Sequence, residues 1–156
     1  MWLNSDRDHQ FDALAAKIRA ADAAAPQLMA DIIAQLCARL PLLNRNGNAA
    51  VRIEKLIRSG AWLDVGLDLI NIELPGWALR RLAYDSGEWH CALSREPNLP
   101  AEIDNTIDAT HTVPALAILA ALVEARRSLV VQEAETSTIP TLRGEQAQTI
   151  CCDNFA

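Results

Sequence analysis

The stretch Trp77 to Arg95, WALRRLAYDSGEWHCALSR, decides the fold class of this chain. Two runs of residues that favour strands flank the tripeptide Asp85-Ser86-Gly87, and Gly87 can take the left-handed conformation that a three-residue loop requires. A two-residue Ser-Gly turn would need a positive φ at Ser86, so we expect the longer loop. The sequence therefore predicts one antiparallel β-hairpin in a chain whose other ordered segments are helical.

The register of this hairpin decides which side chains share a face. With a three-residue loop, Tyr84 pairs with Glu88 and Leu82 pairs with His90, and a slip of one residue would regroup both faces. The more apolar face, which we expect to cover the helices, carries Trp77, Leu79, Ala83, Trp89, Cys91 and Leu93, with Arg81 as its exception. Trp89 and Cys91 are thus predicted core residues, and His90 points to the opposite side.

Four polar residues share the second face: Arg80, Tyr84, Glu88 and His90. An arginine offers a planar fork that suits carboxylates, and a histidine can gain or lose a proton near neutral pH. We therefore name these four as the candidate ligand-binding residues for a small anion or carboxylate. The alternative is a solvated strand face whose residues only form cross-strand pairs.

Two helices are predicted at the start of the chain. Apolar or small residues recur there at a spacing of three and four, which places them on one stripe: Phe11, Leu14, Ile18, Ala21, Ala25, Leu28 and Ile32. Pro26 would break a single continuous helix. We therefore expect one helix to about Ala23 and a second that has Pro26 in its first turn and ends before Pro41.

Further helices are predicted on both sides of the hairpin. Residues 49–59 and 61–73 read as two helices, and Gly60 between them suits a left-handed cap. After the hairpin we expect a short helix over about 102–108. A longer helix should begin near Thr112 and continue at least to Arg127, since a proline is tolerated in a first turn.

The predicted fold class is α+β, with four to five helices packed around a small antiparallel β-hairpin. Composition divides the chain into an N-terminal helical arm (1–43), an α+β core (44–133) and a polar tail (134–156) that we expect to be flexible. An alanine-rich stripe with few large side chains buries little area alone. We therefore expect the N-terminal helices to join two copies in a homodimer, through the stripe from Phe11 to Ile32.

Composition excludes several classes of function. The chain has 156 residues, 51% of them hydrophobic, which is enough for a core, and its net charge of -6 has the wrong sign for general nucleic-acid binding. The longest apolar run, Val113 to Val123, is far shorter than the roughly 20 residues of a membrane span. Acidic residues stand where a secretory signal would be basic and then apolar, so we expect a cytoplasmic protein with reduced cysteines.

No established catalytic motif occurs in the sequence, neither a G-x-S-x-G elbow nor a P-loop, G-x-G-x-x-G or H-E-x-x-H. We therefore expect no enzyme, no catalytic residue and no cofactor. Asp104, Asp108 and His111 have the spacing i, i+4, i+7, so a continuous helix would project them from one side, where they could hold a divalent metal. The alternative is an exposed helix face, and because zinc-ligand spacing is missing we assign no metal site.

The sequence alone does not determine a function. The leading hypothesis is a non-catalytic protein-interaction or homo-oligomerising domain. The alternative is a small-ligand domain that uses the polar hairpin face or a pocket near Trp62 and Trp77. A third hypothesis rests on the order of two helices, a glycine and a hairpin, which resembles the winged helix-turn-helix layout and would bind DNA through the basic row Arg52, Lys55 and Arg58. Acidic residues on the second of these helices argue against it.

Overall fold

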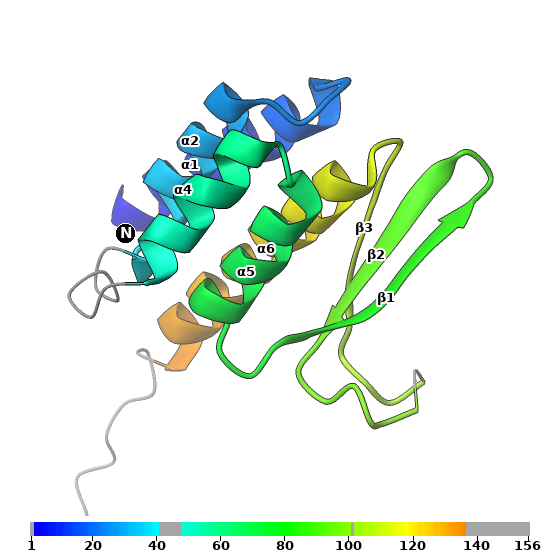
Figure 1. Ribbon diagram of the computed structural model, residues 1–156. Helices are drawn as coiled ribbons and strands as arrows, with labels where there is room; N and C mark the ends of the chain where they lie inside the picture. Colours follow the sequence, from blue (N-terminus) through cyan, green and yellow to red (C-terminus); the bar gives the residue numbers. More distant parts are fainter. Residues whose placement is uncertain (1, 41–47, 101, 137–156) are drawn as a thin grey trace, which may run out of the picture.

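The computed structural model describes residues 2–40, 48–100 and 102–136 (Figure 1). Its elements are α1 (Trp2–Ala20), α2 (Pro26–Leu36), α4 (Ala49–Ser59), α5 (Trp62–Glu73), β1 (Ala78–Asp85), β2 (Glu88–Ser94), β3 (Ile107–His111) and α6 (Pro114–Thr136). The strands form one antiparallel sheet in the order β1-β2-β3. The α+β fold class is confirmed, and the described part of the chain adds a third strand to the predicted hairpin.

Helix boundaries follow the proline and glycine positions that the sequence marks. Helix α2 begins at Pro26, and α6 begins at Pro114. Helix α4 ends at Gly60, whose φ of 70° is the left-handed cap conformation expected there. These signals are reliable because they act through the local backbone geometry of a single residue.

The short helix expected over 102–108 is wrong, because Ile107–His111 forms strand β3 instead. This strand pairs with β2, with Ala109 opposite Cys91 and Ile107 opposite Leu93. The alternation of apolar and polar residues in Ile-Asp-Ala-Thr-His fits a strand that is buried on one side. Pairing with β2 therefore decides the conformation of this segment, and Asp104, Asp108 and His111 do not lie on one helix face.

The predicted three-residue hairpin loop is also wrong. Asp85 pairs directly with Glu88, so the turn has two residues, and Ser86 takes the positive φ of 53° that the sequence analysis considered unfavourable. A β-bulge between Leu79 and Arg81 takes up the extra residue, Arg80. Leu79 consequently faces Leu93 as expected, although the pairs nearer the turn are shifted by one.

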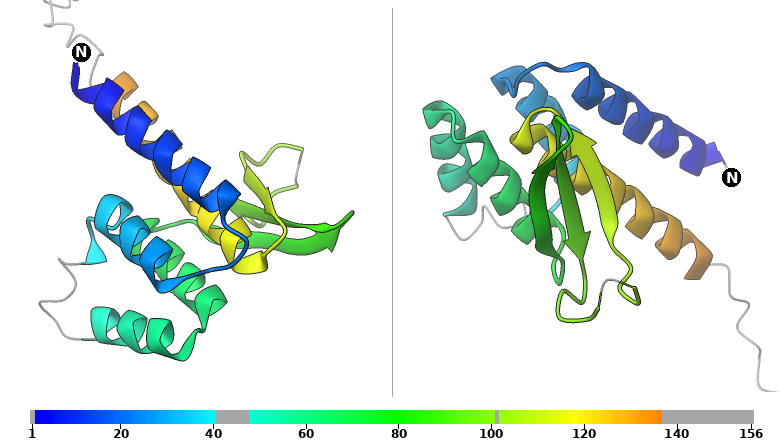
Figure 2. Two further views of the ribbon diagram at one scale, coloured as in Figure 1. Left: turned by 90° about the horizontal axis from the view of Figure 1, so that it is seen from above. Right: turned by 90° about the vertical axis from the view of Figure 1, so that its right-hand side faces the viewer.

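Helix α6 occupies the centre of the molecule. It packs against β2 and β3 on one side and against α1 and α5 on others (Figure 2). Nearly all of its first half is buried: Ala115, Leu116, Ala117, Ile118, Leu119, Ala121, Leu122, Val123 and Ala125. A helix that is apolar on almost every side is stable only when other elements surround it.

The N-terminal helices belong to this same core. Phe11, Leu14, Ile18 and Ile32 are each at most 7% exposed and lie in one buried cluster with the residues of α6. The large side chains that we expected to join two copies are thus already covered within one chain. The homodimer stays a prediction, but the stripe from Phe11 to Ile32 no longer supports it. Among the helices that the structure describes, none is long and apolar enough to cross a membrane.

Helices α5 and α6 approach each other closely at Gly66. A Cβ atom at this position would lie 2.8 Å from Ile118 Cγ2, well inside normal contact distance. Both residues are fully inside the core, where packing density leaves little room for relaxation. The absence of a side chain at Gly66 therefore sets the distance between the two helices.

Gly66→Ala is expected to destabilise the protein. Alanine favours a helix over glycine by about 1 kcal/mol, but overpacking a core costs about 1–3 kcal/mol, so we expect a net loss of about 1 kcal/mol in urea unfolding. The double variant with Ile118→Ala removes the clashing methyl group and should show favourable coupling in a mutant cycle. A Gly66→Ala protein at least as stable as the wild type would contradict this account.

His111 ties the end of β3 to the end of α1. The Val113 backbone N–H donates to its Nδ1 at 3.0 Å, so Nε2 carries the proton and donates to the Ile18 carbonyl at 3.0 Å. The side chain is 8% exposed. One neutral imidazole thus satisfies two backbone groups of segments far apart in the sequence.

His111→Leu should destabilise the protein by about 2–4 kcal/mol, because an apolar side chain leaves the Ile18 carbonyl and the Val113 N–H without partners. His90→Leu is the matched control, since His90 is half-buried on the other face of the sheet and its side chain makes no hydrogen bond to described residues. Guanidinium unfolding of both variants provides the comparison. Equal losses would show that the two hydrogen bonds of His111 contribute nothing specific.

Candidate functional site

The four residues predicted to form a site on the hairpin do not share one face. Tyr84 pairs with Trp89, on the face that packs toward α6, and its ring contacts the Trp89 ring at a centroid distance of 5.4 Å. Glu88 and His90 lie on the opposite, open face. The predicted grouping is therefore wrong, because it rested on the three-residue loop. Whether any of these residues contacts a ligand stays a prediction.

Arg80, the fourth of these residues, is already engaged. Its guanidinium donates to Asp104 Oδ2 at 2.6 Å and to the Leu99 carbonyl at 2.8 Å, and Ser94 Oγ donates to the same carboxylate oxygen. The Asp104 side chain is only 3% exposed. A buried carboxylate needs such partners, so Arg80 holds the loop before β3 against the hairpin.

The possible metal ligands are also separated. Asp104 lies in this loop, Asp108 is exposed and accepts a hydrogen bond from Thr106, and His111 is buried on the other face of β3. Within residues 2–40, 48–100 and 102–136, no group of three or more His, Cys, Asp or Glu side chains is placed to hold a metal ion.

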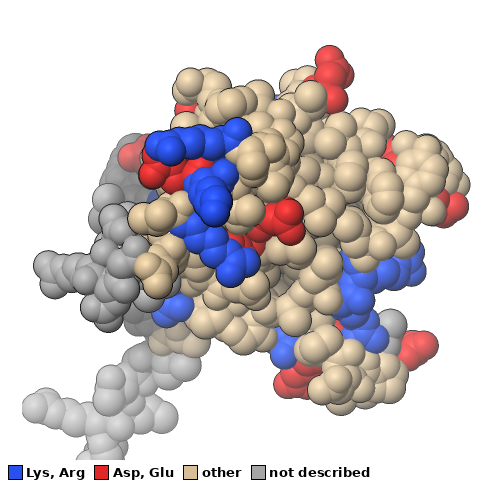
Figure 3. Space-filling view, in the orientation of Figure 1, with Lys and Arg blue, Asp and Glu red and all other residues tan. Residues whose placement is uncertain are grey.

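The basic row of the winged-helix hypothesis is largely neutralised. Arg52 forms an ion pair with Asp68 at 2.6 Å, and Arg58 pairs with Glu54. Figure 3 shows acidic side chains among the basic ones on this side of the molecule. Phosphate binding requires a positive surface, which these pairs weaken.

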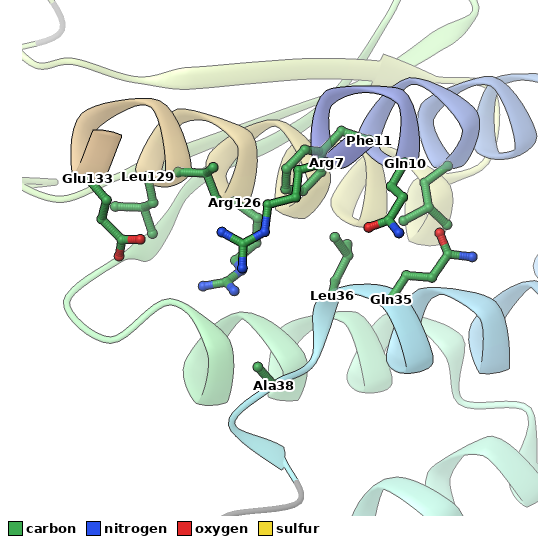
Figure 4. A pocket seen from close by; sticks show the side chains of 11 residues that line it. Arg7, Gln10, Phe11, Gln35, Leu36, Ala38, Arg126, Leu129 and Glu133 are labelled. Carbon is green, nitrogen blue, oxygen red and sulfur yellow. The ribbon is translucent and has the colours of Figure 1, made fainter. Parts of the chain in front are cut away.

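A different pair of arginines meets at a pocket between α1, α2 and α6, which we call the helical pocket. Its volume is about 160 Å³. Its polar lining consists of Arg7, Gln10, Gln35, Arg126 and Glu133, and apolar residues such as Leu14 and Leu36 form the rest of the wall. Figure 4 shows the arginine side chains of α1 and α6 extending into the space between the helices.

Helix geometry explains why both arginines reach the pocket, Arg7 as an exposed residue and Arg126 as a half-buried one. Arg7 stands four residues before Phe11, and Arg126 stands four residues after Leu122, so each continues the buried stripe of its helix by one turn. Phe11 and Leu122 are both core residues. Arg7 and Arg126 were not among the predicted site residues, although each is an arginine at a stripe position of its helix.

Neither arginine forms an ion pair within the described residues. No ion pair or hydrogen bond joins Arg7 or Arg126 to a described side chain, and the Nε atom of Arg126 is buried without an acceptor. Glu133 lines the same pocket but lies outside ion-pair distance of both. Two like charges at one small, partly apolar site repel each other, so an anion between them would lower the free energy.

Glu73 fixes the turn after α2, which forms part of the pocket wall. Its carboxylate is 1% exposed and accepts hydrogen bonds from the backbone N–H groups of Arg39 at 3.1 Å and Leu40 at 2.8 Å. This capping holds the turn after α2, which includes the pocket residue Ala38. The end of α5 thereby positions the end of α2.

The thiol of Cys37, in this same turn, is not a nucleophile. Burial raises its pKa to about 12, the charge of Glu73 acts in the same direction, and Arg126 opposes them. Burial, with a smaller contribution from Asp108, likewise raises the pKa of Cys91 to about 12. Because the thiolate is the reactive form, both cysteines are inert at neutral pH.

The buried thiols predict a loss of stability in alkaline solution. A thiol whose pKa rises from 9.0 to about 12 on folding stabilises the fold fully below pH 9, and this contribution is lost as the pH approaches 12. Each pH unit above 9 should remove about 1.4 kcal/mol per thiol in urea unfolding. The Cys37→Ala/Cys91→Ala double variant should show a shallower decline, and an identical slope would contradict the assignment.

No family model matches this chain, and no curated protein or solved structure is similar to it. The assignment of a function therefore depends on the chemistry of the pocket itself. That chemistry consists of two guanidinium groups that form no ion pair within the described residues, the carboxylate of Glu133, two side-chain amides and an apolar wall.

Proposed function

We propose that this protein is a binding domain for a small anion, a carboxylate or a phosphate, held in the helical pocket. The supporting observation is that Arg7 and Arg126 both line this pocket without an ion pair to any described residue. The proposal keeps the small-ligand alternative from the sequence and moves the site from the hairpin to the helices.

The volume of the pocket limits the size of the ligand. Pockets for drug-sized molecules measure about 300–1,000 Å³, whereas this one measures about 160 Å³. An inorganic anion or an organic acid of a few carbon atoms is the appropriate class. Two guanidinium forks suit such oxyanions because each can donate two parallel hydrogen bonds.

The remaining lining residues support the same ligand class. Gln10 and Gln35 carry amide groups that can donate to further oxygen atoms of the anion. Apolar neighbours such as Leu14 reduce the local dielectric constant, which strengthens the attraction between the anion and the arginines. The inert thiol of Cys37 supports binding without catalysis.

Two further hypotheses from the sequence are homo-oligomerisation and a cytoplasmic location, and only the second remains part of this proposal. Homo-oligomerisation loses its main support because the stripe from Phe11 to Ile32 contributes its large side chains to the core of one chain. A cytoplasmic location remains part of the proposal, since Cys37 and Cys91 are free thiols, as expected in a reducing compartment.

Arg7→Gln and Arg126→Gln should each weaken anion binding at least about tenfold, because a hydrogen bond to a charged group contributes about 1.5–3 kcal/mol. Isothermal titration with phosphate, sulfate, acetate and succinate at low ionic strength measures this. Arg58→Gln is the matched control, because Arg58 is exposed and paired with Glu54, and it should leave the affinity unchanged.

Stability provides a second readout. Because the two arginines repel each other, Arg7→Gln should leave the ligand-free protein as stable as the wild type or more stable, while reducing the stabilisation by the anion. Absence of binding by all four anions, or equal affinities of Arg126→Gln and Arg58→Gln, would refute the proposal.

A further inference from the structure

A second pocket lies between the sheet, the loop before β3 and the C-terminal half of α6, and we call it the Trp77 pocket. Its volume is about 580 Å³, within the range of cavities that hold organic ligands. Trp77, Arg95, Asn105, Thr106, Ser128 and Gln132 are among its lining residues. No residue lines both this pocket and the helical pocket, so the two sites are independent.

The indole of Trp77 has an unsatisfied hydrogen-bond donor. The residue is 9% exposed, and its Nε1 atom is buried without an acceptor in the part of the chain that the structure describes. Buried indole N–H groups usually have a partner, because an unpaired buried donor is unfavourable. The atom has almost no accessible surface, so a ligand acceptor would reach it only after a small movement of the surrounding side chains.

Arg95 supplies a second flat group at the same place. Its guanidinium lies 5.5 Å from the centroid of the Trp77 ring, and the side chain is exposed and makes no ion pair with a described residue. Guanidinium planes and indole faces both stack on flat heteroaromatic rings. The combination therefore favours a planar aromatic ligand over a saturated one.

The rim of the pocket combines uncharged polar side chains with Arg95 and with the carboxyl groups of Glu96 and Asp104. Asn105 and Thr106 contribute an amide and a hydroxyl group from the loop, and Ser128 and Gln132 contribute the same two groups from α6. These side chains can both donate and accept hydrogen bonds. They suit a ring that carries heteroatoms or an amide better than a hydrocarbon.

The loop that carries half of this rim is held in place before any ligand binds. Arg80 binds Asp104 and the Leu99 carbonyl, and the Asp104 carboxylate also accepts a hydrogen bond from Ser94. Asp104 itself lines the pocket. Binding therefore requires little ordering of the loop, which favours affinity.

We propose that the Trp77 pocket binds a planar heteroaromatic molecule, of nucleobase or nicotinamide size, between Arg95 and the polar rim. Its ring stacks on the exposed face of the Arg95 guanidinium, which lies over Trp77, and its heteroatoms bond to the rim. This inference does not depend on anion binding in the helical pocket.

The test is a titration of the full chain with adenosine and nicotinamide at about 1 mM, where weak binding is detectable. The probe signal is the Trp77 indole N–H resonance in a proton–nitrogen correlation spectrum. We expect either compound to shift this resonance, and cyclohexanecarboxamide, a saturated amide of similar size, to leave it unchanged. The Trp77→Phe variant assigns the resonance by its loss.

Two variants then test the recognition. Arg95→Gln and Trp77→Phe should each weaken binding about tenfold, as is usual for an Arg or Trp anchor. Because Trp77→Phe lacks the indole resonance, its binding is measured from the backbone amide resonances of Asn105 and Thr106. Arg81→Gln, on the open face of the sheet, is the matched control and should bind normally. Retained binding by Arg126→Gln would separate this site from the helical pocket.

The proposal is overturned if neither aromatic probe moves the Trp77 resonance, or if the saturated amide moves it equally. Equal affinities of Arg95→Gln and Arg81→Gln would also overturn it. Circular dichroism of each variant establishes that a loss of binding occurs in a folded protein.

Discussion

Burial of helix α6 is the constraint on which the rest of the structure depends. The run from Ala115 to Ala125 is apolar around almost its whole circumference, so no single neighbour can cover it. The sheet covers one side, α5 approaches another at Gly66, and α1 closes a third. Both pockets are gaps that this arrangement leaves beside the less apolar second half of the same helix.

Buried polar contacts fix the orientation that apolar packing leaves open. Glu73 joins α5 to the end of α2, His111 joins β3 to α1, and Arg80 joins β1 to the loop at Asp104. Hydrophobic burial is non-directional, whereas a hydrogen bond is satisfied only over a narrow range of distance and angle. The contact of Glu73 thereby fixes a wall of the helical pocket, and the contact of Arg80 fixes the loop that lines the Trp77 pocket.

Local signals in the sequence predicted more of the fold than long-range ones. Pro26, Gly60 and Pro114 mark helix ends correctly because each acts on its own backbone. Strand β3 escaped prediction because it depends on pairing with β2, and the hairpin register did because the bulge at Arg80 has no clear local signature. A short apolar or alternating segment is ambiguous until its partner is known.

The candidate site was harder to predict than the fold. Arg7 and Arg126 come from the first and last described helices, and nothing in either local sequence indicates that they meet. By contrast, Tyr84 and His90 belong to the same short hairpin, yet their side chains lie on opposite faces of the sheet. The two arginines are recognised as a pair only because the fold brings them together, and not because reactive residues cluster around them in the sequence.

The order of elements along the chain determines when this core can form during synthesis. Phe11, Leu14 and Ile18 pack against a helix that begins at Pro114, so their partner is the last of the described elements to be made. At common translation rates, roughly ten seconds separate the two events. During that interval the nascent N-terminal helices expose apolar side chains, and a chain whose synthesis stops before α6 would lack the helix around which the core forms.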